Sequence, residues 1–486
     1  MEDSTFTLTV LLCAGVILAA VFSNRLTRLL RVPAPALFLI LASVAALFLP
    51  SFEDAARLID ERVVSVALVV ILFDGGTRIG WRRFRGSLGA IAWIGIAGTA
   101  VTAAAIAVAA HFLFGFDWMS SMLLGAALSP TDPAVVFSVL GQREISGRSG
   151  TILEGESGAN DPVGIALMVT LIGVTGTGWE AIGSGLGAFT LQLAIGAIVG
   201  IGGGLALRWI LRHGHLADEA LTVIFPIAAA VLLYALAAAF GGSGFLAAFI
   251  AGILLGDVRA PYKRDIERFS SGMASLAEIA VFILLGLSIR LEDVFQPDVL
   301  LAGFAIAGLL IFVIRPVLVG LLIVPVRLQR GERAFVLWAG LKGAVPILLG
   351  MLVLGSGAPD AARLYAIIFI VVVVSVLLQG GLVPLFARLL RVPTKAVPVR
   401  PWSLDIRFAD EPDGLHRHVV APGSPADGRT VAEISRGDDD WISLISRSGR
   451  NIPVRNGTTL EAGDVVLTQT DGAASLKDQF TPPAKG

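Results

Sequence analysis

Long apolar runs recur along the first 390 or so residues of the 486-residue chain and then stop. Most of them are close to the roughly 20 residues that a helix needs to cross the hydrocarbon layer of a bilayer. This pattern predicts an all-α polytopic membrane protein with about thirteen transmembrane helices. We expect them at about residues 5–24, 34–50, 63–77, 87–113, 118–141, 150–175, 183–211, 219–240, 243–256, 270–289, 299–326, 333–355 and 361–390.

The pattern changes after Pro393. From about residue 400, short apolar runs such as Trp441-Ile442-Ser443-Leu444-Ile445 alternate with turn residues such as Ser448-Gly449. Short runs bounded by turn residues are typical of β-strands. We therefore expect a transmembrane domain, a linker, and a small, mostly β cytoplasmic domain with one short helix near Thr430 to Ile434, at residues 1–392, 393–401 and 402–486 respectively.

Lysine and arginine are concentrated in every second loop, with 21 in one set of loops and four in the alternate set. By the positive-inside rule, the richer set is cytoplasmic, so the N-terminus lies outside and the C-terminus inside. The first span follows Met1-Glu2-Asp3, which has no positively charged region of the kind that precedes a cleaved signal, so we expect this span to be retained. The predicted location is the cell inner (plasma) membrane, with multiple spans.

Composition excludes several classes of function. The chain is 55% hydrophobic and 15% charged, with a net charge of −1, so it offers no basic stripe for a nucleic-acid partner. Its single cysteine cannot form an intrachain disulfide. The sequence shows no metal-ligand cluster, phosphate-binding loop or nucleophile elbow. We therefore expect no enzyme activity, no cofactor and no resident metal, and the lipid bilayer as the chain's surroundings.

Polar residues interrupt the apolar span at 150–175, where residues 156–162 read Glu-Ser-Gly-Ala-Asn-Asp-Pro. An ionisable side chain at the bilayer centre costs roughly 2.5–3.5 kcal/mol and usually faces a pathway for ions or protons. On a helix, Ser157 and Asp161 share one face, and Glu156 and Asn160 share the neighbouring face. The first face offers a hydroxyl and a carboxylate, the oxygen ligands that an alkali ion takes. Asp161 is thus the principal candidate to bind a cation or a proton.

Two basic residues, Arg315 and Lys342, also lie at membrane depth, where each needs a partner. Arg315 beside Glu156 and Asn160 would form a charge-assisted cluster that keeps Glu156 ionised. Asp161 would then have no fixed cation and would hold either a proton or a metal cation. Because the two ligands exclude each other, this arrangement predicts exchange transport.

Two of the spans contain helix-breaking sequences, Ser129-Pro130-Thr131-Asp132-Pro133 and the run from Gly340 to Pro346. Irregular backbone at membrane depth survives only where it lines a cavity or is buried in protein. Both interruptions fall in the fifth span of their half of the chain, which predicts inverted repeats with two broken crossing helices. At such a crossing, Asp132 would offset the positive helix ends and Lys342 the negative ends. Direct contact of Asp132 with the ion is the alternative, and Thr131 either donates its carbonyl to the ion or caps a half-helix.

Other polar and small residues carry weaker signals. Asp74 lies near a span end, where it predicts a turn or a helix cap. Glu278 either lies on a cytoplasmic-side pathway or pairs with a loop arginine. Gly155, Gly158 and Gly164 favour close helix packing over a role as ligands.

Four motifs in order, Thr131-Asp132-Pro133, the run 156–162, Arg315 and Gly340-Leu341-Lys342-Gly343, resemble the monovalent cation:proton antiporter-1 family, the NhaP-like sodium/proton exchangers. The resemblance implies thirteen helices arranged as a dimerisation domain and a six-helix core, and a homodimer. It also implies electroneutral exchange, because an Asn-Asp pair stands at 160–161. By motif, it assigns Asp161 as the cation and proton carrier with Asp132 beside it, Ser157 and the Thr131 backbone as ligands, and a stabilising cluster of Glu156, Asn160 and Arg315.

The tail carries a second resemblance. Residues 423–434, Asn451-Ile452-Pro453 and Gly463-Asp464-Val465-Val466 are similar to the C-terminal lobe of potassium-conductance regulatory domains, although the dinucleotide-binding lobe is absent. This implies a small regulatory ligand, or a dimerising or gating role. Antiporters with this ending resemble the potassium/proton group named for cell volume regulation. We therefore expect a secondary antiporter that exchanges cytoplasmic K⁺, with Na⁺ second, for external protons by alternating access. A tail-gated cation channel is the alternative.

Overall fold

The computed structural model describes residues 11, 14–15, 18, 33–48, 61–140, 143–145, 147–174, 179–213, 219–258, 260, 262–396, 415–435, 440–447, 450–470 and 477–481. The chain divides into two compact units, residues 1–397 and 398–486. Each unit has its own hydrophobic core. The first is helical and the second is built on an antiparallel sheet, which confirms the predicted fold class at this level.

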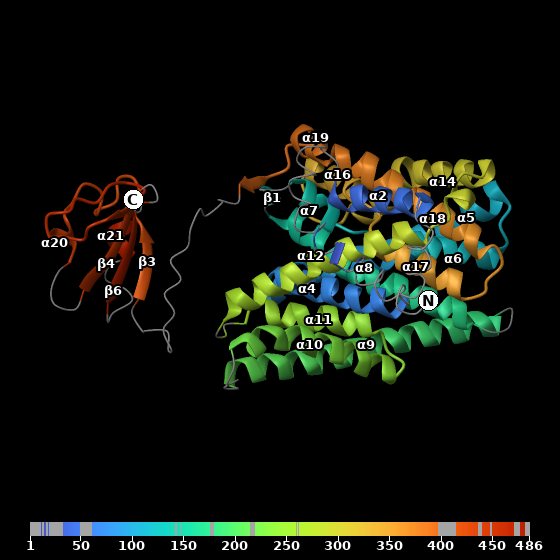
Figure 1. Ribbon diagram of the computed structural model, residues 1–486, viewed down its shortest axis with the longest axis horizontal. Helices are drawn as coiled ribbons and strands as arrows, with labels where there is room; N and C mark the ends of the chain where they lie inside the picture. Colours follow the sequence, from blue (N-terminus) through green and yellow to red (C-terminus); the bar gives the residue numbers. More distant parts are fainter. Residues whose placement is uncertain are drawn as a thin grey trace. The chain divides into compact units, whose positions relative to one another are not determined.

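Each expected span from 34–50 onward contains at least one helix of the first unit, although several helices extend beyond the expected limits (Figure 1). The span expected at 5–24 lies largely outside the described residues, so the total of thirteen stays a prediction. The helices, including three π-helical stretches named η, are α2 Ala34–Phe48, α4 Glu61–Ala92, η1 Trp93–Gly98, α5 Thr99–Phe114, α6 Trp118–Leu128, α7 Ala134–Leu140, α8 Arg148–Gly173, α9 Trp179–His213, α10 Glu219–Ala239, α11 Gly244–Gly256, α12 Lys263–Ser288, α13 Leu291–Val294, α14 Pro297–Leu309, η2 Leu310–Val319, α15 Gly320–Leu322, α16 Arg330–Trp338, α17 Ala344–Gly355, α18 Ala361–Val374, η3 Ser375–Gly380 and α19 Gly381–Leu389.

The outer surface of this unit is apolar. Large hydrophobic side chains such as Phe112, Ile198 and Leu321 are more than two-thirds exposed. In the described part of the chain, six continuous helical segments are long and apolar enough to cross a membrane, and four apolar helices are shorter. A helical unit with an apolar exterior is suited to lipid, so the expected multi-pass membrane protein is confirmed.

Helix α4 contains the expected span 63–77 and the start of the next one, 87–113, with a glycine between them. Gly80 has φ 68° and ψ 157°, a backbone conformation that residues with a Cβ rarely adopt. Asp257 lies against it, and its Oδ2 accepts a hydrogen bond from the backbone N–H of Arg82 at 2.6 Å. The spans predicted at 63–77 and 87–113 are therefore separated by this kink.

Helix α8 is surrounded by other helices. It contacts α4, α6, α9, α11 and α17, while α9, α10 and α11 pack side by side (Figure 1). Close approach depends on glycine: a Cβ would lie 2.3 Å from Ile91 at Gly155, 2.0 Å from Phe249 at Gly158, and 2.4 Å from Pro130 at Gly164. The expected close packing at these three glycines is confirmed.

Two helices are interrupted where they meet. An irregular segment, Ser129 to Pro133, separates α6 from α7, and a second, Ala339 to Gly343, separates α16 from α17. The two segments touch, because the backbone N–H of Asp132 donates a hydrogen bond to the carbonyl of Leu341 at 2.8 Å. Four helix ends therefore meet at one place inside the unit.

A short strand pair links distant parts of the first unit. Strand β1, Arg143–Ile145, pairs antiparallel with β2, Thr394–Ala396, with Arg143 opposite Ala396 and Ile145 opposite Thr394. The start of the segment expected as a linker is thus a strand that pairs with residues just before α8.

The second unit has a four-stranded antiparallel sheet in the order β3-β6-β4-β5. Its elements are β3 Leu415–Val419, α20 Val431–Ile434, β4 Asp440–Arg447, β5 Arg450–Ile452, β6 Val465–Thr470 and α21 Lys477–Phe480. The short helix expected near Thr430 to Ile434 is confirmed as α20. The guanidinium of Arg447 donates two hydrogen bonds of 2.9 Å to the fully buried carboxylate of Asp464, which fixes β4 against the turn before β6.

Candidate functional site

A buried ion pair joins α8 to η2. The Arg315 Nη2 atom lies 2.8 Å from Glu156 Oε1, and both side chains are about 5% exposed or less. The same guanidinium donates to the carbonyls of Leu337 at 2.9 Å and Val336 at 3.3 Å, in the last turn of α16. Arg315 therefore holds both the acid on α8 and the unsatisfied end of a broken helix.

Gly340 leaves room for the Arg315 guanidinium to reach Glu156. A Cβ at Gly340 would lie 1.9 Å from Arg315 Cζ. Any larger residue would overlap the guanidinium and displace it from Glu156. The small residue in the break after α16 is thus a packing requirement of the ion pair.

Asn160 connects α8 to the other break. Its Nδ2 donates to Thr131 Oγ1 at 2.7 Å, and its Oδ1 accepts from the backbone N–H of Thr131 at 3.3 Å. Both residues are buried. This reciprocal pair fixes the backbone of Thr131 beside α8, one turn from Glu156.

Asp161 has a different environment from Glu156. It is 5% exposed, and Ser157 Oγ donates to its Oδ2 at 3.4 Å. Its Oδ1 has no hydrogen-bond partner, and no cation pairs with it among the residues that the structure describes. A buried carboxylate without a fixed cation can be neutralised by a proton or by a bound metal cation.

Lys342 lies at the end of α6. Its Nζ donates to the carbonyls of Ser129 at 3.1 Å and Pro130 at 2.8 Å, and the side chain is almost fully buried. The last carbonyls of a helix carry partial negative charge. The ammonium group is therefore placed where it offsets the C-terminal end of α6.

Asp132 lies at the other kind of helix end, the N-terminus of α17. Its Oδ2 accepts a hydrogen bond from the backbone N–H of Ala344 at 3.4 Å, in the first turn of α17. A Cβ at Gly343 would lie 2.0 Å from the same oxygen. The carboxylate thus lies against the positive end of α17.

These contacts gather the predicted site residues in one region, around α8 and the two breaks. The structure links Glu156 to Arg315, Asn160 to Thr131 and Ser157 to Asp161. The crossing itself contains Asp132 and Lys342. The arrangement offers the buried carboxylate of Asp161, which pairs with no cation among the described residues, beside irregular backbone, and this is suited to binding a small cation or a proton.

Residues 15–389 match the family described as "Sodium/hydrogen exchanger, transmembrane", and residues 415–480 match the TrkA-C domain. The chain belongs to the sodium/hydrogen exchanger family. This confirms the two resemblances drawn from the motifs of the membrane part and the tail.

Similar proteins include antiporters of both K⁺ and Na⁺. The K(+)/H(+) antiporter NhaP of Alkalimonas amylolytica is 37% identical over 71% of this chain and 61% of its own length. The K(+)/H(+) antiporter NhaP2 of Shewanella sp. (strain MR-4) is 32% identical over 86% of this chain and 74% of its own. The Na(+)/H(+) antiporter NhaH of Halobacillus dabanensis is 29% identical over 70% of this chain and 88% of its own.

The fold matches a solved structure of the sodium proton antiporter MjNhaP1 from Methanocaldococcus jannaschii. The TM-score is 0.66 at 20% identity, over 77% of this chain and 99% of that one. The sodium/hydrogen exchangers are transporters, so the predicted class, a cation:proton antiporter and not an enzyme, is confirmed. A channel is not favoured.

Two other acids in this exchanger had expectations from the sequence: the one for Asp74 is wrong, and one of the two alternatives for Glu278 is excluded. Asp74 is not a turn or cap, because it lies within α4, where its Oδ2 is 2.7 Å from Arg78 Nε and its Oδ1 accepts from Ser271 Oγ of α12 at 2.9 Å. The four-residue spacing to Arg78 was the available signal. Glu278 forms no pair with a loop arginine among the described residues, and its Oε1 is buried without a partner.

A polar pair on η3 was missed by the sequence analysis. Ser375 Oγ accepts from the backbone N–H of Lys342 at 2.9 Å and donates to Gln379 Oε1 at 2.6 Å. Gln379 Nε2 in turn donates to the carbonyl of Trp338 at 3.2 Å. Both polar side chains are about 1% exposed. Their four-residue spacing in an apolar span was the available signal, and they support the backbone of the second break.

Proposed function

We propose that this exchanger transports a cytoplasmic monovalent cation, K⁺ in preference to Na⁺, against external protons at a single site on α8. The observation that supports the proposal is that two acids on α8 have different partners. Glu156 is paired with Arg315, whereas the buried Asp161 accepts a hydrogen bond from Ser157 and pairs with no cation among the described residues. A carboxylate that must be neutralised by one ligand or the other couples their movements in opposite directions.

Each residue of the region has a role in this proposal. Asp161 carries the cation or the proton, and Ser157, the Thr131 backbone and Asp132 lie around the bound ion. The cluster of Glu156, Asn160 and Arg315 stabilises the site. Lys342 and Asp132 compensate the helix ends at the crossing.

Exchange without net charge movement follows from the same geometry. One carboxylate alternates between one proton and one monovalent cation, while Glu156 stays paired with Arg315. Each half-cycle then carries a neutralised site across the membrane. Alternating access of the site to the two sides completes the cycle.

The preference for K⁺ rests on similarity. The two K⁺/H⁺ antiporters share 37% and 32% identity with this chain, compared with 29% for the Na⁺/H⁺ antiporter. The TrkA-C domain supports the same assignment. We place the protein in the potassium/proton group associated with cell volume regulation, with residues 402–486 as a cytoplasmic regulatory domain for a small ligand, joined by a linker at 393–401 to an antiporter domain at 1–392.

The proposed architecture is a homodimer in the inner membrane. Each protomer has thirteen spans in two inverted repeats, with the N-terminus outside and the C-terminus in the cytoplasm. The two broken helices, which meet through Asp132 and Leu341, support the repeat. The concentration of basic residues in alternate loops supports the orientation.

Reconstituted protein tests the proposal directly. Full-length chain in liposomes that contain a pH-sensitive dye should dissipate an imposed pH gradient when K⁺ is added, and less effectively with Na⁺. Asp161→Asn should abolish the response, because an amide cannot alternate between proton and cation. Asp293→Asn, a matched change in the short helix α13 before α14, should leave it intact.

Two outcomes would contradict the proposal. The first is full exchange by Asp161→Asn, which would place the carrier elsewhere. The second is an electrical current driven by K⁺ without proton movement, which would revive the channel alternative.

A further inference from the structure

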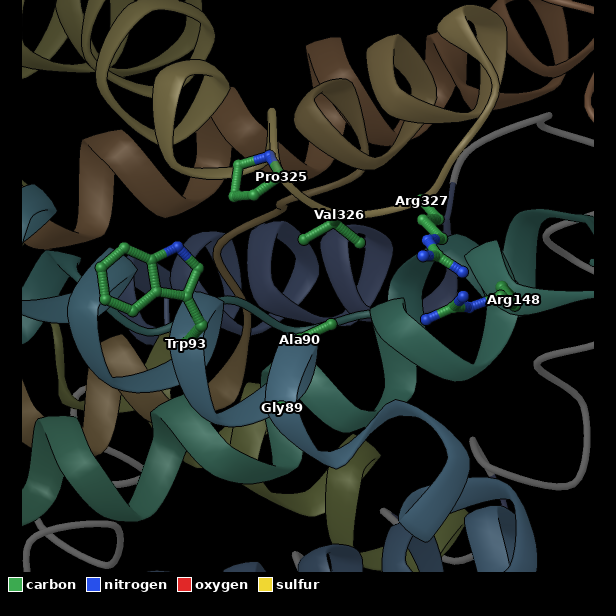
Figure 2. Close-up of a pocket in the computed structure, with 7 residues that line it drawn as sticks. All are labelled: Gly89, Ala90, Trp93, Arg148, Pro325, Val326 and Arg327. Carbon is green, nitrogen blue, oxygen red and sulfur yellow. The ribbon is translucent and has the colours of Figure 1, made fainter.

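A cleft on the first unit contains none of the proposed exchange-site residues. It lies between α4, the start of η1, the N-terminus of α8 and the segment that follows α15 (Figure 2). Its volume is about 430 Å³. The lining residues are Gly89, Ala90, Trp93, Arg148, Pro325, Val326 and Arg327.

One end of the cleft is strongly basic. Figure 2 shows the side chains of Arg148 and Arg327 directed toward each other from opposite walls, and both residues are exposed. Within the described ranges, neither side chain has a hydrogen bond or an ion pair. Two guanidinium groups that face each other repel unless an anion lies between them. The arrangement therefore favours an anionic ligand.

No neighbouring acid of α16 supplies that anion. Glu332 has Oε1 occupied by the hydroxyl of Ser149 at 3.2 Å and Oε2 by the backbone N–H of Gln329 at 3.0 Å. Its carboxylate makes no ion pair with either arginine of the cleft. Among the described residues, no acid pairs with the two arginines, so their positive charge is available to a ligand.

The other end of the cleft is apolar. Trp93 lines it and is 48% exposed, although its Nε1 donates to the carbonyl of Leu322 at 3.0 Å, which fixes the ring against α15. Leu321 and Val324, on either side of that contact in sequence, are 72% and 54% exposed. Tryptophan is enriched where a membrane protein meets the headgroup region of the bilayer.

The basic end and the apolar end of the cleft together fit a ligand that has an anionic head and an apolar tail. Arginine binds phosphate with two parallel N–H donors, and basic pockets between transmembrane helices on the cytoplasmic side hold phospholipid headgroups. Arg148 and Arg327 both fall in the loops expected from the sequence, whose charge predicts the cytoplasmic side. We propose that this cleft binds an anionic phospholipid of the cytoplasmic leaflet, with its phosphate between Arg148 and Arg327 and its acyl chains along Trp93, Leu321 and Val324. A free phosphate ion would use the basic end alone.

Lipid titration of the purified full-length chain in detergent provides the test, read out by native mass spectrometry and by thermal unfolding. Phosphatidylglycerol should bind and raise the unfolding temperature, and phosphatidylcholine should do neither. Each arginine near an anionic lipid is worth about 1 kcal/mol, so Arg148→Gln combined with Arg327→Gln should weaken binding about 30-fold. Arg212→Gln combined with Arg330→Gln removes two exposed arginines outside the cleft and should bind as the unchanged protein does.

A second variant distinguishes a loss of lipid binding from a folding defect caused by removing the two arginines. Ala90→Phe fills the cleft and leaves both arginines in place, so it should also lose phosphatidylglycerol binding while the chain remains monodisperse on size exclusion. Undiminished binding by folded protein of either cleft variant would overturn the proposal. Equal stabilisation by inorganic phosphate alone would overturn the lipid assignment as well, because it would show that the apolar end contributes nothing.

Discussion

The ion pair between Arg315 and Glu156 is a costly arrangement that this chain maintains inside the membrane part. Removing two charges from water carries a penalty that only good geometry and further hydrogen bonds repay. Arg315 has both, since it pairs with Glu156 at 2.8 Å and donates to two carbonyls of α16. Loss of one partner would leave the other charge buried and unpaired.

Arg315→Met should therefore destabilise the protein by about 3–5 kcal/mol, because it leaves Glu156 without its cation. Chemical unfolding of the purified protein in detergent would measure the loss. Glu156→Gln combined with Arg315→Met should recover much of it, since no charge is then left unpaired. Arg330→Met, at an exposed position in the same half of the chain, is the control and should stay within about 0.5 kcal/mol.

An unchanged unfolding transition in Arg315→Met would show that the pair does not stabilise the fold. In that case the role of Arg315 would be limited to transport. Comparing exchange rates of the single and double variants would then separate the two effects.

Many contacts of the charged residues could be predicted from the sequence, because a charged side chain inside a membrane needs a partner and few are available. Arg315 pairs with Glu156 for that reason, whereas Lys342 is satisfied by two backbone carbonyls at the crossing. The sequence could not reveal that Asp74 bonds Ser271, or that Ser375 supports Lys342, because those partners lie on helices whose faces only packing determines. The transport roles of the candidate site residues stay predictions.

At the scale of elements, the broken helices depend on what satisfies their ends. A helix end within a bilayer leaves backbone groups that water cannot reach. Lys342 serves the carbonyls after α6, Asp132 serves the start of α17, and Arg315 serves the end of α16. Two prolines three residues apart predicted the first break. The exact limits of the breaks could not be predicted, because they depend on hydrogen bonds from η2 and η3.

The other end of α6 gives a pH-dependent prediction. Asp117 is its N-cap, and the Oδ2 atom accepts from the backbone N–H of Ser120 at 3.0 Å. Hydrogen bonding with Ser120 lowers the pKa of Asp117 below its usual value. The folded state thus favours the charged form, so the cap's contribution is complete above the ordinary aspartate pKa and is lost as pH falls through the folded value.

Asp117→Ala should cost about 0.5–1 kcal/mol at neutral pH, and the difference from the unchanged protein should shrink toward pH 3. Asp117→Asn caps a helix about as well and carries no charge, so it should remove the pH dependence while keeping most of the stability. Unfolding curves in detergent at several pH values provide the measurement. A constant difference between Asp117→Ala and unchanged protein across that range would rule out this account.

At the scale of the whole molecule, composition alone predicted a membrane part and a β tail. The two compact units, with separate cores, agree with that description. Strand β2 could not be predicted from the sequence, because its three residues, Thr394–Ala396, are too few to show a periodic pattern. Their partner is 250 residues away in sequence, so only the tertiary structure brings β1 and β2 together.

Two truncations test whether the membrane unit is self-sufficient. A chain that ends after Val397 keeps β2 and should retain cation:proton exchange in liposomes. A chain that ends after Val392 removes β2, leaves β1 unpaired and should unfold at a lower temperature, with a loss of about 1–3 kcal/mol from the missing ladder hydrogen bonds. Loss of exchange by the longer chain would show that transport requires the tail.

The β1–β2 pair also has a mechanical consequence. The chain leaves β2 at Ala396 toward the tail and leaves β1 at Ile145 toward α8, and these two exits lie at opposite ends of the antiparallel ladder. A pull on the tail is carried by the backbone through β2 to α19 and, in part, across the ladder to β1, whose hydrogen bonds are then loaded in shear and resist together. The ladder thus ties the end of α19 to the start of α8, the helix that contains Asp161, through three pairs of residues.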